Sequence, residues 1–229
     1  MVFAHVQRNG REWRRGRRMR TLRSAFGLAG MALGAALVLA TPARAASESF
    51  YTQVPSDVVS LTQSGILSPK HFVPPTIQKF SEPAIKNGIA FLHKLRDAKG
   101  EVIGFGTQLE EVALDKDGKF TGLHNTSWTL VIPGRGSLFL FETEDSRKLG
   151  SLLRQAPKTT VAMPWKGPVE TTTSGPAEGG LGVIMGGTGE FAGKKGTFVE
   201  INRFTAIDPN NPSGSPFLFE IEVKVDYAE

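Results

Sequence analysis

The sequence predicts an antiparallel all-β protein of seven or eight strands that close into a barrel. From residue 87 onward, runs of β-forming residues are separated by Gly, Pro and Asp turns, and no long helical pattern interrupts them. In the last run, Phe217–Tyr227, apolar and polar side chains alternate, which is the period of a strand with one buried face. Closure removes the exposed edges of so large a sheet; a β-sandwich is the alternative.

The N-terminal segment, residues 1–45, has the composition of a targeting sequence. It holds nine of the 27 Lys and Arg residues and one of the 22 Asp and Glu residues. Arginines precede a 15-residue apolar run, Phe26–Ala40, and Ala43-Arg44-Ala45 follows it. A membrane anchor needs about 20 apolar residues, so the pattern indicates a secretory signal peptide. We expect a periplasmic or extracellular protein that is cleaved after Ala45 or Ala46, with Met19 as an alternative start.

The remaining chain, residues 46–229, carries 18 basic and 21 acidic side chains, a net charge of −3. A mildly acidic surface does not attract a phosphate backbone, so we predict no nucleic-acid partner and, after processing, no membrane anchor. The chain contains no cysteine. This excludes disulfides, thiol catalysis and thiolate metal sites.

Residues 46–87 are predicted to form an irregular arm that precedes the barrel. Proline occurs five times in this segment, too often for a long helix or a central strand. A short helix is expected to start at Ser56, whose hydroxyl would cap it, and to end at Gly65. The rest is expected to run extended along a barrel domain formed by residues 88–229.

The barrel domain divides into strands and turns along the chain. Asp115–Gly118 is a strong turn signal, and Gly104 and Gly106 mark a bend or bulge within a long strand. Residues 145–180 are less regular, with a short apolar run at Thr160–Met163. The predicted strands are Ile89–Leu95, Glu101–Leu114, Phe120–Ile132, Ser137–Glu144, Leu181–Met185, Gly196–Ile207 and Pro216–Tyr227.

A glycine-rich segment, Gly186–Gly193, has the glycine spacing of a dinucleotide-binding loop. Such a loop needs a helix directly after it, because the helix N-terminus binds the pyrophosphate. Here a strand pattern follows instead, starting at Gly196. We therefore interpret the segment as a β-arch whose backbone needs glycine.

The run Val183–Glu200, VIMGGTGEFAGKKGTFVE, resembles the glycine-rich hairpin of the dirigent and allene oxide cyclase superfamily. Gly186–Gly196 matches the superfamily pattern G-G-T/S-G-x-F-x-x-x-x-G, and a weaker likeness extends from Gly88 to Tyr227. The resemblance implies an eight-stranded antiparallel barrel with a mostly apolar lumen that holds one small molecule. Barrels of this type are often trimeric, so we expect a homotrimer or a homodimer.

The resemblance does not extend to the known site residues of the superfamily. Plant allene oxide cyclases have a Glu-x-Asn pair on the first strand, and the corresponding stretch here is Phe91–Leu95. Dirigent proteins often have His-Asp at that strand, whereas His93 is followed by Lys94. The fold is therefore implied, but neither named activity is.

Three residues are weak candidates for catalysis: Glu110, Glu111 and His93. Adjacent strand residues face opposite sides, so at most one of Glu110 and Glu111 can enter the lumen. His93 and His124 lie in predicted strands without Asp or Glu at ligand spacing, and each is as easily explained as a packed or surface histidine. We predict neither a metal nor an organic cofactor.

Five residues are candidates for lining the lumen. A polar group on an aromatic strand face is costly to bury unless it has a purpose, which singles out Glu200 and Asn202. Trp128 either fills the core or forms an aromatic wall for a ligand. The candidates are Trp128, Phe198, Glu200, Asn202 and Phe204.

Two functions are compatible with these residues. The first is an exported barrel that binds a small apolar molecule and steers its cyclisation or isomerisation by shape, as an isomerase without a cofactor. The second is a non-catalytic exported carrier or scaffold that uses the same barrel. Convergent polar groups in the lumen would favour the enzyme, and a plugged lumen would favour the carrier.

Overall fold

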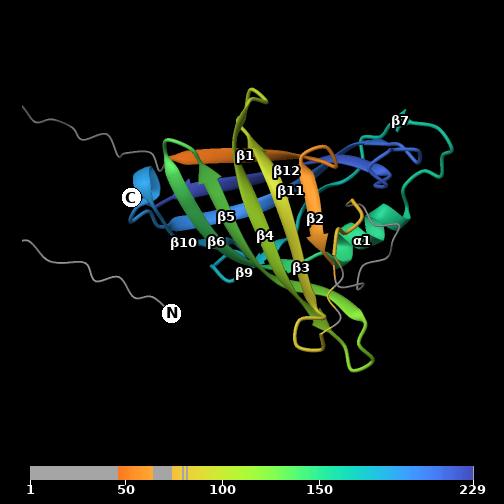
Figure 1. Ribbon diagram of the computed structural model, residues 1–229, viewed down its shortest axis with the longest axis horizontal. Coiled ribbons are helices and arrows are strands. Elements are labelled where there is room, and N and C mark those ends of the chain that lie inside the picture. Colours follow the sequence, from red (N-terminus) through yellow and green to blue (C-terminus); the bar gives the residue numbers. More distant parts are fainter. Residues whose placement is uncertain (1–45, 64–73, 79, 81, 229) are drawn as a thin grey trace, which may run out of the picture. The chain divides into compact units, whose positions relative to one another are not determined.

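The computed structural model describes residues 46–63, 74–78, 80 and 82–228 (Figure 1). All of them belong to one compact unit that comprises residues 42–229. The predicted leader, residues 1–45, lies outside the described residues. Among the described residues, no helix has both the length and the apolar composition that crossing a bilayer requires.

The described part of the unit is built mainly of strands, with one short α-helix and one 3-10 turn. Two long hairpins and the C-terminal strand pair supply most of the sheet. The elements are β1 (Ser47–Val54), β2 (Val58–Thr62), β3 (Gly88–Arg96), β4 (Val102–Leu114), β5 (Phe120–Ile132), β6 (Gly136–Asp145), α1 (Arg147–Arg154), β7 (Met163–Pro164), β8 (Val169–Thr171), β9 (Thr173–Gly175), β10 (Gly182–Gly187), η1 (Gly189–Phe191), β11 (Gly196–Ile207) and β12 (Phe217–Tyr227).

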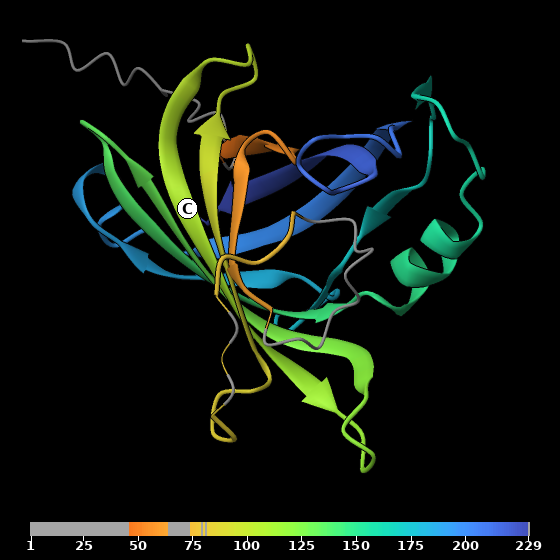
Figure 2. The ribbon, with the colours of Figure 1, turned by 45° about the vertical axis from the view of Figure 1, so that its right-hand side comes forward.

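Eight antiparallel strands form a closed barrel in the order β1-β12-β11-β10-β6-β5-β4-β3. The barrel closes where Tyr51 of β1 pairs with Arg96 of β3. Figures 1 and 2 show these strands curving round a common interior. The predicted fold class is therefore confirmed, and the sandwich alternative is wrong, since a sandwich has no such closing pair.

The predicted arm over residues 46–87 needs correction, because its first part belongs to the barrel. Strand β1 pairs along its whole length with β12, from Ser47 opposite Asp226 to Val54 opposite Phe219. The predicted helix from Ser56 is wrong as well. Val58–Thr62 forms β2, which pairs with β3 and buries alternate residues. Pairing with β3 stabilises this segment as a strand, which outweighs a local capping signal.

The other predicted strands are confirmed within one or two residues at their ends. A register shift lies beside Gly104, where the bulge was expected, between the pairs Leu95–Gly104 and Arg96–Val102. The alternation of β12 places Phe219, Ile221 and Val223 in the interior. Glu222 departs from the pattern, because it is buried although it belongs to the outward set.

The glycine-rich segment joins β10 to the antiparallel β11, as the pattern predicts. Its backbone runs against the β5–β6 turn. A Cβ built on Gly189 would lie 2.2 Å from the carbonyl oxygen of Arg135, and one built on Gly136 would lie 2.1 Å from that of Thr188. Both glycines also have positive φ. Glycine is required at both positions, because a side chain would collide with the facing backbone.

The interior changes character along the barrel. Inward residues at one end are apolar, such as Leu138 and Leu140 of β6 and Phe198 of β11, and burying each stabilises the fold by about 1.5–3 kcal/mol. Further along the same strands, the inward positions are polar. This change leaves a cavity in the middle of the barrel.

Candidate functional site

The cavity in the lumen measures about 70 Å³, counted as the space open to the centre of a water molecule. This is room for several waters or for one small organic molecule. Two kinds of wall surround it. The apolar wall consists of Val54, Val58, Ile89, Phe91, Phe120, Leu149 and Ile221. The polar wall consists of His93, Gln108, Glu110, His124, Glu144, Ser146, Thr172, Glu200 and Asn202.

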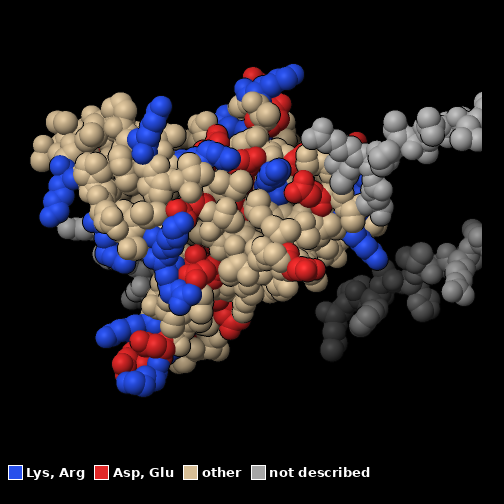
Figure 3. Space-filling view, turned by 180° about the vertical axis from the view of Figure 1, so that it is seen from behind, with Lys and Arg blue, Asp and Glu red and all other residues tan. Residues whose placement is uncertain are grey.

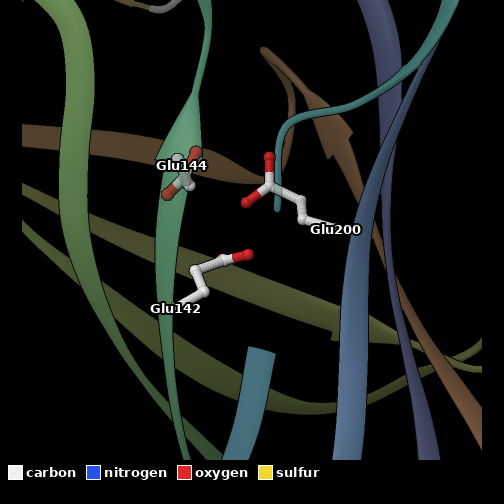
Figure 4. Close-up of side chains that lie close together, drawn as sticks. All are labelled: Glu142, Glu144 and Glu200. Carbon is white, nitrogen blue, oxygen red and sulfur yellow. The ribbon is translucent and has the colours of Figure 1, made fainter. Parts of the chain in front are cut away.

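Three glutamates meet at the polar wall, and strand geometry places them there. Glu142 and Glu144 are two residues apart on β6, so both point inward from the same face. Glu200 reaches them from β11. Figure 4 shows the three side chains directed toward one another. One carboxyl oxygen from each lies within 4.8 Å of the other two.

Neighbouring donors hold two of these carboxyls in place. The indole Nε1 of Trp128 donates to Oε1 of Glu142 at 2.8 Å, and the Thr173 hydroxyl donates to Oε2 at 2.5 Å. Oε1 of Glu200 accepts hydrogen bonds from Asn202 at 3.0 Å and Thr172 at 3.2 Å. Oε2 of Glu200 and Oε1 of Glu144 are buried without a partner.

Burial makes these carboxyls weak acids. Burial raises the pKa of Glu144 to about 7; the charge of His124 opposes this rise and that of Glu110 adds to it. The pKa values of Glu142 and Glu200 rise well above the usual range, first through burial and then through the charge of Glu144. Near neutral pH we therefore expect Glu142 and Glu200 to be protonated and Glu144 to exchange its proton readily.

A buried ion pair lies beside the cluster. Nδ1 of His124 is 2.8 Å from Oε2 of Glu110, and Nε2 is 3.0 Å from the Ser146 hydroxyl. Since that hydroxyl donates to the carbonyl of Gly122, its oxygen has to accept from Nε2–H. Both ring nitrogens of His124 then carry hydrogen, and the imidazolium faces the Glu110 carboxylate.

The surroundings of His124 favour this charged form. Burial alone would lower the pKa of His124. The hydrogen bond to Glu110 and the charges of Glu144, Glu110 and Glu200 outweigh burial and raise the pKa to about 9.

His93 has the opposite environment. It is fully buried between Phe91 and Trp128, with ring centroids at 6.0 and 5.1 Å. Neither ring nitrogen has a hydrogen bond of good geometry. Burial lowers the pKa of His93 to about 4, against the effect of the nearby Gln108 side chain, so the ring is neutral near pH 7.

The structure separates the predicted site residues. Glu110 lines the cavity and Glu111 is exposed on the outside of the same strand, which agrees with the expectation that at most one enters the lumen. His93 lines the cavity as a packed, neutral side chain. Glu200 and Asn202 line the cavity too.

The other three lining candidates lie outside the lining of this cavity. Trp128 and Phe198 are buried in the core, and Phe204 stacks on Phe219 with centroids 4.7 Å apart. Strands β5 and β11 are long, so only part of the inward face of each reaches the cavity.

Sequence reasoning missed Glu142, Glu144 and the pairing of His124 with Glu110. A signal for the two glutamates is present in the sequence. On Gly136–Asp145 the inward set is Leu138, Leu140, Glu142 and Glu144, so two acids continue an apolar strand face. The partner of His124 has no such signal, because Glu110 is 14 residues away on another strand.

The three carboxyls are close enough together to offer oxygen donors to a cation. To bind a cation, Glu142 and Glu200 would first have to lose the protons that they keep because they are buried. We therefore interpret the cluster as a group that holds protons. The predicted absence of a metal and a cofactor stays a prediction. On the face seen in Figure 3, basic and acidic side chains are interspersed and neither sign dominates.

No protein-family model matches the chain, and no curated protein matches it. Solved structures with a related arrangement include a pyocyanin demethylase, with 14% identity over 79% of this chain and 99% of that chain, at a TM-score of 0.33. The Diels–Alderase AbmU from Streptomyces koyangensis has 10% identity over 80% of this chain and 64% of its own, at 0.36. AbnU, an exo-specific intermolecular Diels–Alderase, has 12% identity over 79% and 96%, at 0.34. Likenesses at this level say nothing about the substrate or activity of this chain.

Proposed function

We propose that the barrel binds a small, mostly apolar molecule in its lumen and isomerises or cyclises it by proton transfer through Glu144. One observation carries this proposal. Glu144 lines the cavity, and its Oε1 is buried without a hydrogen-bond partner. A carboxyl in that position is free to exchange a proton with a molecule bound against the apolar wall.

The acidity of Glu144 suits this role. A group with a pKa of about 7 is present in both protonation states near neutral pH, so it can take a proton and return it. Burial raises this pKa most, the charge of His124 on β5 lowers it and that of Glu110 on β4 raises it. The other titratable groups that face Glu144 are Glu142 on the same strand and Glu200 on β11.

The reaction class follows from what the cavity contains. In an isomerisation or cyclisation, a proton leaves one atom of the substrate and the same or another proton returns to a second atom, so atoms and electrons balance without a co-reactant. The apolar wall would hold the molecule in one orientation beside Glu144. Positioning of that kind can lower a barrier by roughly 7–11 kcal/mol in favourable cases.

We also propose that the protein is exported and that copies of it associate. The leader in residues 1–45 supports export. Association is supported by a cross-strand row on the outside of the barrel, Leu92, Thr107, Thr129 and Phe139, which carries no charge. Exposed apolar side chains of that kind are typical of surfaces that another chain covers. The family resemblance of residues 183–200 supports a barrel that holds a small molecule, but it supports neither named activity of the superfamily.

Binding in the lumen is tested with two neighbouring residues of β2. Val58 lines the cavity, whereas Val59 is 41% exposed. Val58→Phe should fill the cavity and abolish the retention of a small molecule in native mass spectrometry. Val59→Phe, its matched control, should retain that molecule. Equal retention by both variants would place the molecule outside the lumen and end the proposal.

Proton transfer is tested with cyclohex-3-enone, a small ketone whose double bond shifts into conjugation by proton transfer. The wild type should accelerate this shift above buffer, Glu144→Gln should lose the acceleration, and the exposed control Glu111→Gln should keep it. A protein that retains a molecule in its lumen but transfers no proton, to this probe or to the retained molecule in D2O, would be the non-catalytic carrier instead.

A further inference from the structure

The cavity has a surplus of carboxyl groups over positive charges. Glu110, Glu144 and Glu200 line it, Glu142 lies behind them, and none of the described lining residues is Lys or Arg. Among the described lining residues, the positive group is His124, and it is paired with Glu110. Glu144, with a pKa of about 7, is then the carboxyl that offers a bound molecule a negative charge without a counter-charge near neutral pH.

Two carboxyl oxygens of the polar wall accept no hydrogen bond from the described residues. Trp128 and Thr173 donate to Glu142, and Thr172 and Asn202 donate to one oxygen of Glu200. No donor reaches Oε1 of Glu144 or Oε2 of Glu200. Buried oxygens without donors are costly, so a ligand that supplies N–H groups would remove a penalty already present in the protein.

His93 adds an independent observation on the facing strand β3. It is 2% exposed, it lines the same cavity, and neither ring nitrogen makes a hydrogen bond of good geometry with the described residues. A neutral imidazole has one nitrogen that can only accept a hydrogen bond. The cavity thus offers a third acceptor, contributed by a residue outside the acidic cluster.

The apolar part of the lining determines the rest of the ligand. Ile89, Phe91, Phe120 and Leu149 form an apolar surface that includes two aromatic rings. Aromatic faces attract cations, and apolar surface favours a hydrocarbon or aromatic body. The wall fits a molecule with one charged end and one apolar end.

We infer that the ligand of the lumen is a small organic cation, in which an apolar or aromatic body carries a protonated nitrogen that donates to Glu144 and Glu200. This inference rests on the proposed function, because it concerns the same cavity, and it narrows the substrate class. A carboxylate ligand is disfavoured by the same reasoning, since its charge would be repelled by the ionised form of Glu144.

The test uses three probes of nearly equal size that differ in charge: benzylamine, which is protonated at pH 7.5, benzyl alcohol, which is neutral, and benzoate. Isothermal titration calorimetry at that pH should give benzylamine at least a tenfold lower Kd than benzyl alcohol. Benzoate should bind most weakly. A Kd for benzyl alcohol or benzoate equal to or lower than that for benzylamine would overturn the inference.

Variants assign the preference to the carboxyls. Glu144→Gln, which removes the carboxyl that ionises near pH 7, should reduce the preference for benzylamine over benzyl alcohol to threefold or less. Glu111→Gln, which changes an exposed carboxyl of β4, should keep the full preference. Equal loss in Glu111→Gln would overturn the inference, because the preference would then come from the overall charge.

The results also separate this inference from the proposed function. If all three probes bind equally and Glu144 still transfers protons, the function stands and the organic cation is wrong. If none of them binds but the wild type still accelerates the cyclohex-3-enone shift, the inference falls and the function stands; if that acceleration is absent as well, both fall. Binding of Mn²⁺, detected by electron paramagnetic resonance, together with no binding of benzylamine would overturn the inference in favour of a metal ion.

Discussion

Nδ1 of His124 lies 2.8 Å from Oε2 of Glu110, which makes these two residues a buried ion pair between neighbouring strands. The hydrogen bond to Glu110 is the largest of the effects that raise the pKa of His124 to about 9. In Glu110→Gln, the largest of these effects is lost, burial lowers the pKa as before, and the pKa of His124 should fall well below 9. NMR titration of the His124 ring proton measures this change. A value that stays near 9 in the variant would contradict the assignment.

This pair should also make stability depend on pH. The pKa of His124 in the folded protein, about 9, is above the ordinary value of 6.5, so the folded state binds this proton more tightly than the unfolded state. The resulting stability is complete below pH 6.5 and is lost as the pH rises through 9. For a shift of this size it is on the order of 3 kcal/mol.

Removing the proposed acid–base residue should stabilise the fold. The pKa of Glu144 is about 7 in the folded protein against an ordinary 4.5, so the folded state holds this proton more tightly and stability falls as the pH rises from 4.5 to 7. Glu144→Gln does not ionise and should be more stable than the wild type by about 2–3 kcal/mol at pH 8. Urea unfolding at pH 8 and pH 4.5 tests this, with no gain expected at the lower pH.

His93 should limit stability in acid. Its pKa of about 4 in the folded protein is below the ordinary 6.5, so the unfolded state binds this proton more tightly and stability falls as the pH drops from 6.5 to 4. His93→Phe keeps the ring contacts with Phe91 and Trp128 and has no proton to bind. Its unfolding free energy should therefore change less than that of the wild type between pH 7 and 4.5. An identical decrease in both proteins would show that other groups control acid unfolding.

The barrel seam should depend on Asp57. This buried carboxylate accepts two hydrogen bonds from Arg96, at 2.6 and 2.8 Å, beside the pair Tyr51–Arg96 that closes the barrel. Breaking one side of a buried ion pair costs about 3–5 kcal/mol, and the partial exposure of Arg96 reduces this, so we expect Asp57→Asn to cost about 2–3 kcal/mol in urea unfolding. Lys94→Ala is the control, because Lys94 contacts the same carboxylate from a side chain that is 55% exposed, and it should cost less than about 1 kcal/mol.

The uncharged row on the barrel surface should determine the oligomeric state. Leu109 and Phe105 flank this row on β4 and are 53% and 48% exposed. Leu109→Lys should convert a trimer or dimer to monomers in light scattering, because a buried lysine without a partner is costly. Val161→Lys changes a residue that is 65% exposed outside this sheet and should leave the assembly intact. A monomeric wild type would contradict the proposed association.

Much of the fold could be predicted because its signals are local. The alternation of Phe217–Tyr227 and the turn at Asp115–Gly118 depend on residues close together in the chain. Alternation of apolar and polar residues with a period of two indicates a half-buried strand. Strand β1 could not be predicted, because the signal that makes it a strand is not local. Its neighbourhood is rich in proline, and its strand conformation is stabilised by pairing with β12, more than 160 residues away.

The sequence by itself determined that this chain forms an antiparallel β domain, that its glycine-rich segment turns one late strand onto the next, and that Glu110 and Glu111 face opposite sides. Only the tertiary structure decided that Glu110, Glu142, Glu144 and Glu200 share one lumen with His124. The physical reason is register. A shift of one residue between strands would turn every one of these carboxyls to the outside, and barrel closure and strand pairing select the register. The raised pKa values of Glu142, Glu144 and Glu200 follow from this arrangement, because burial and neighbouring charges make a carboxyl a weaker acid.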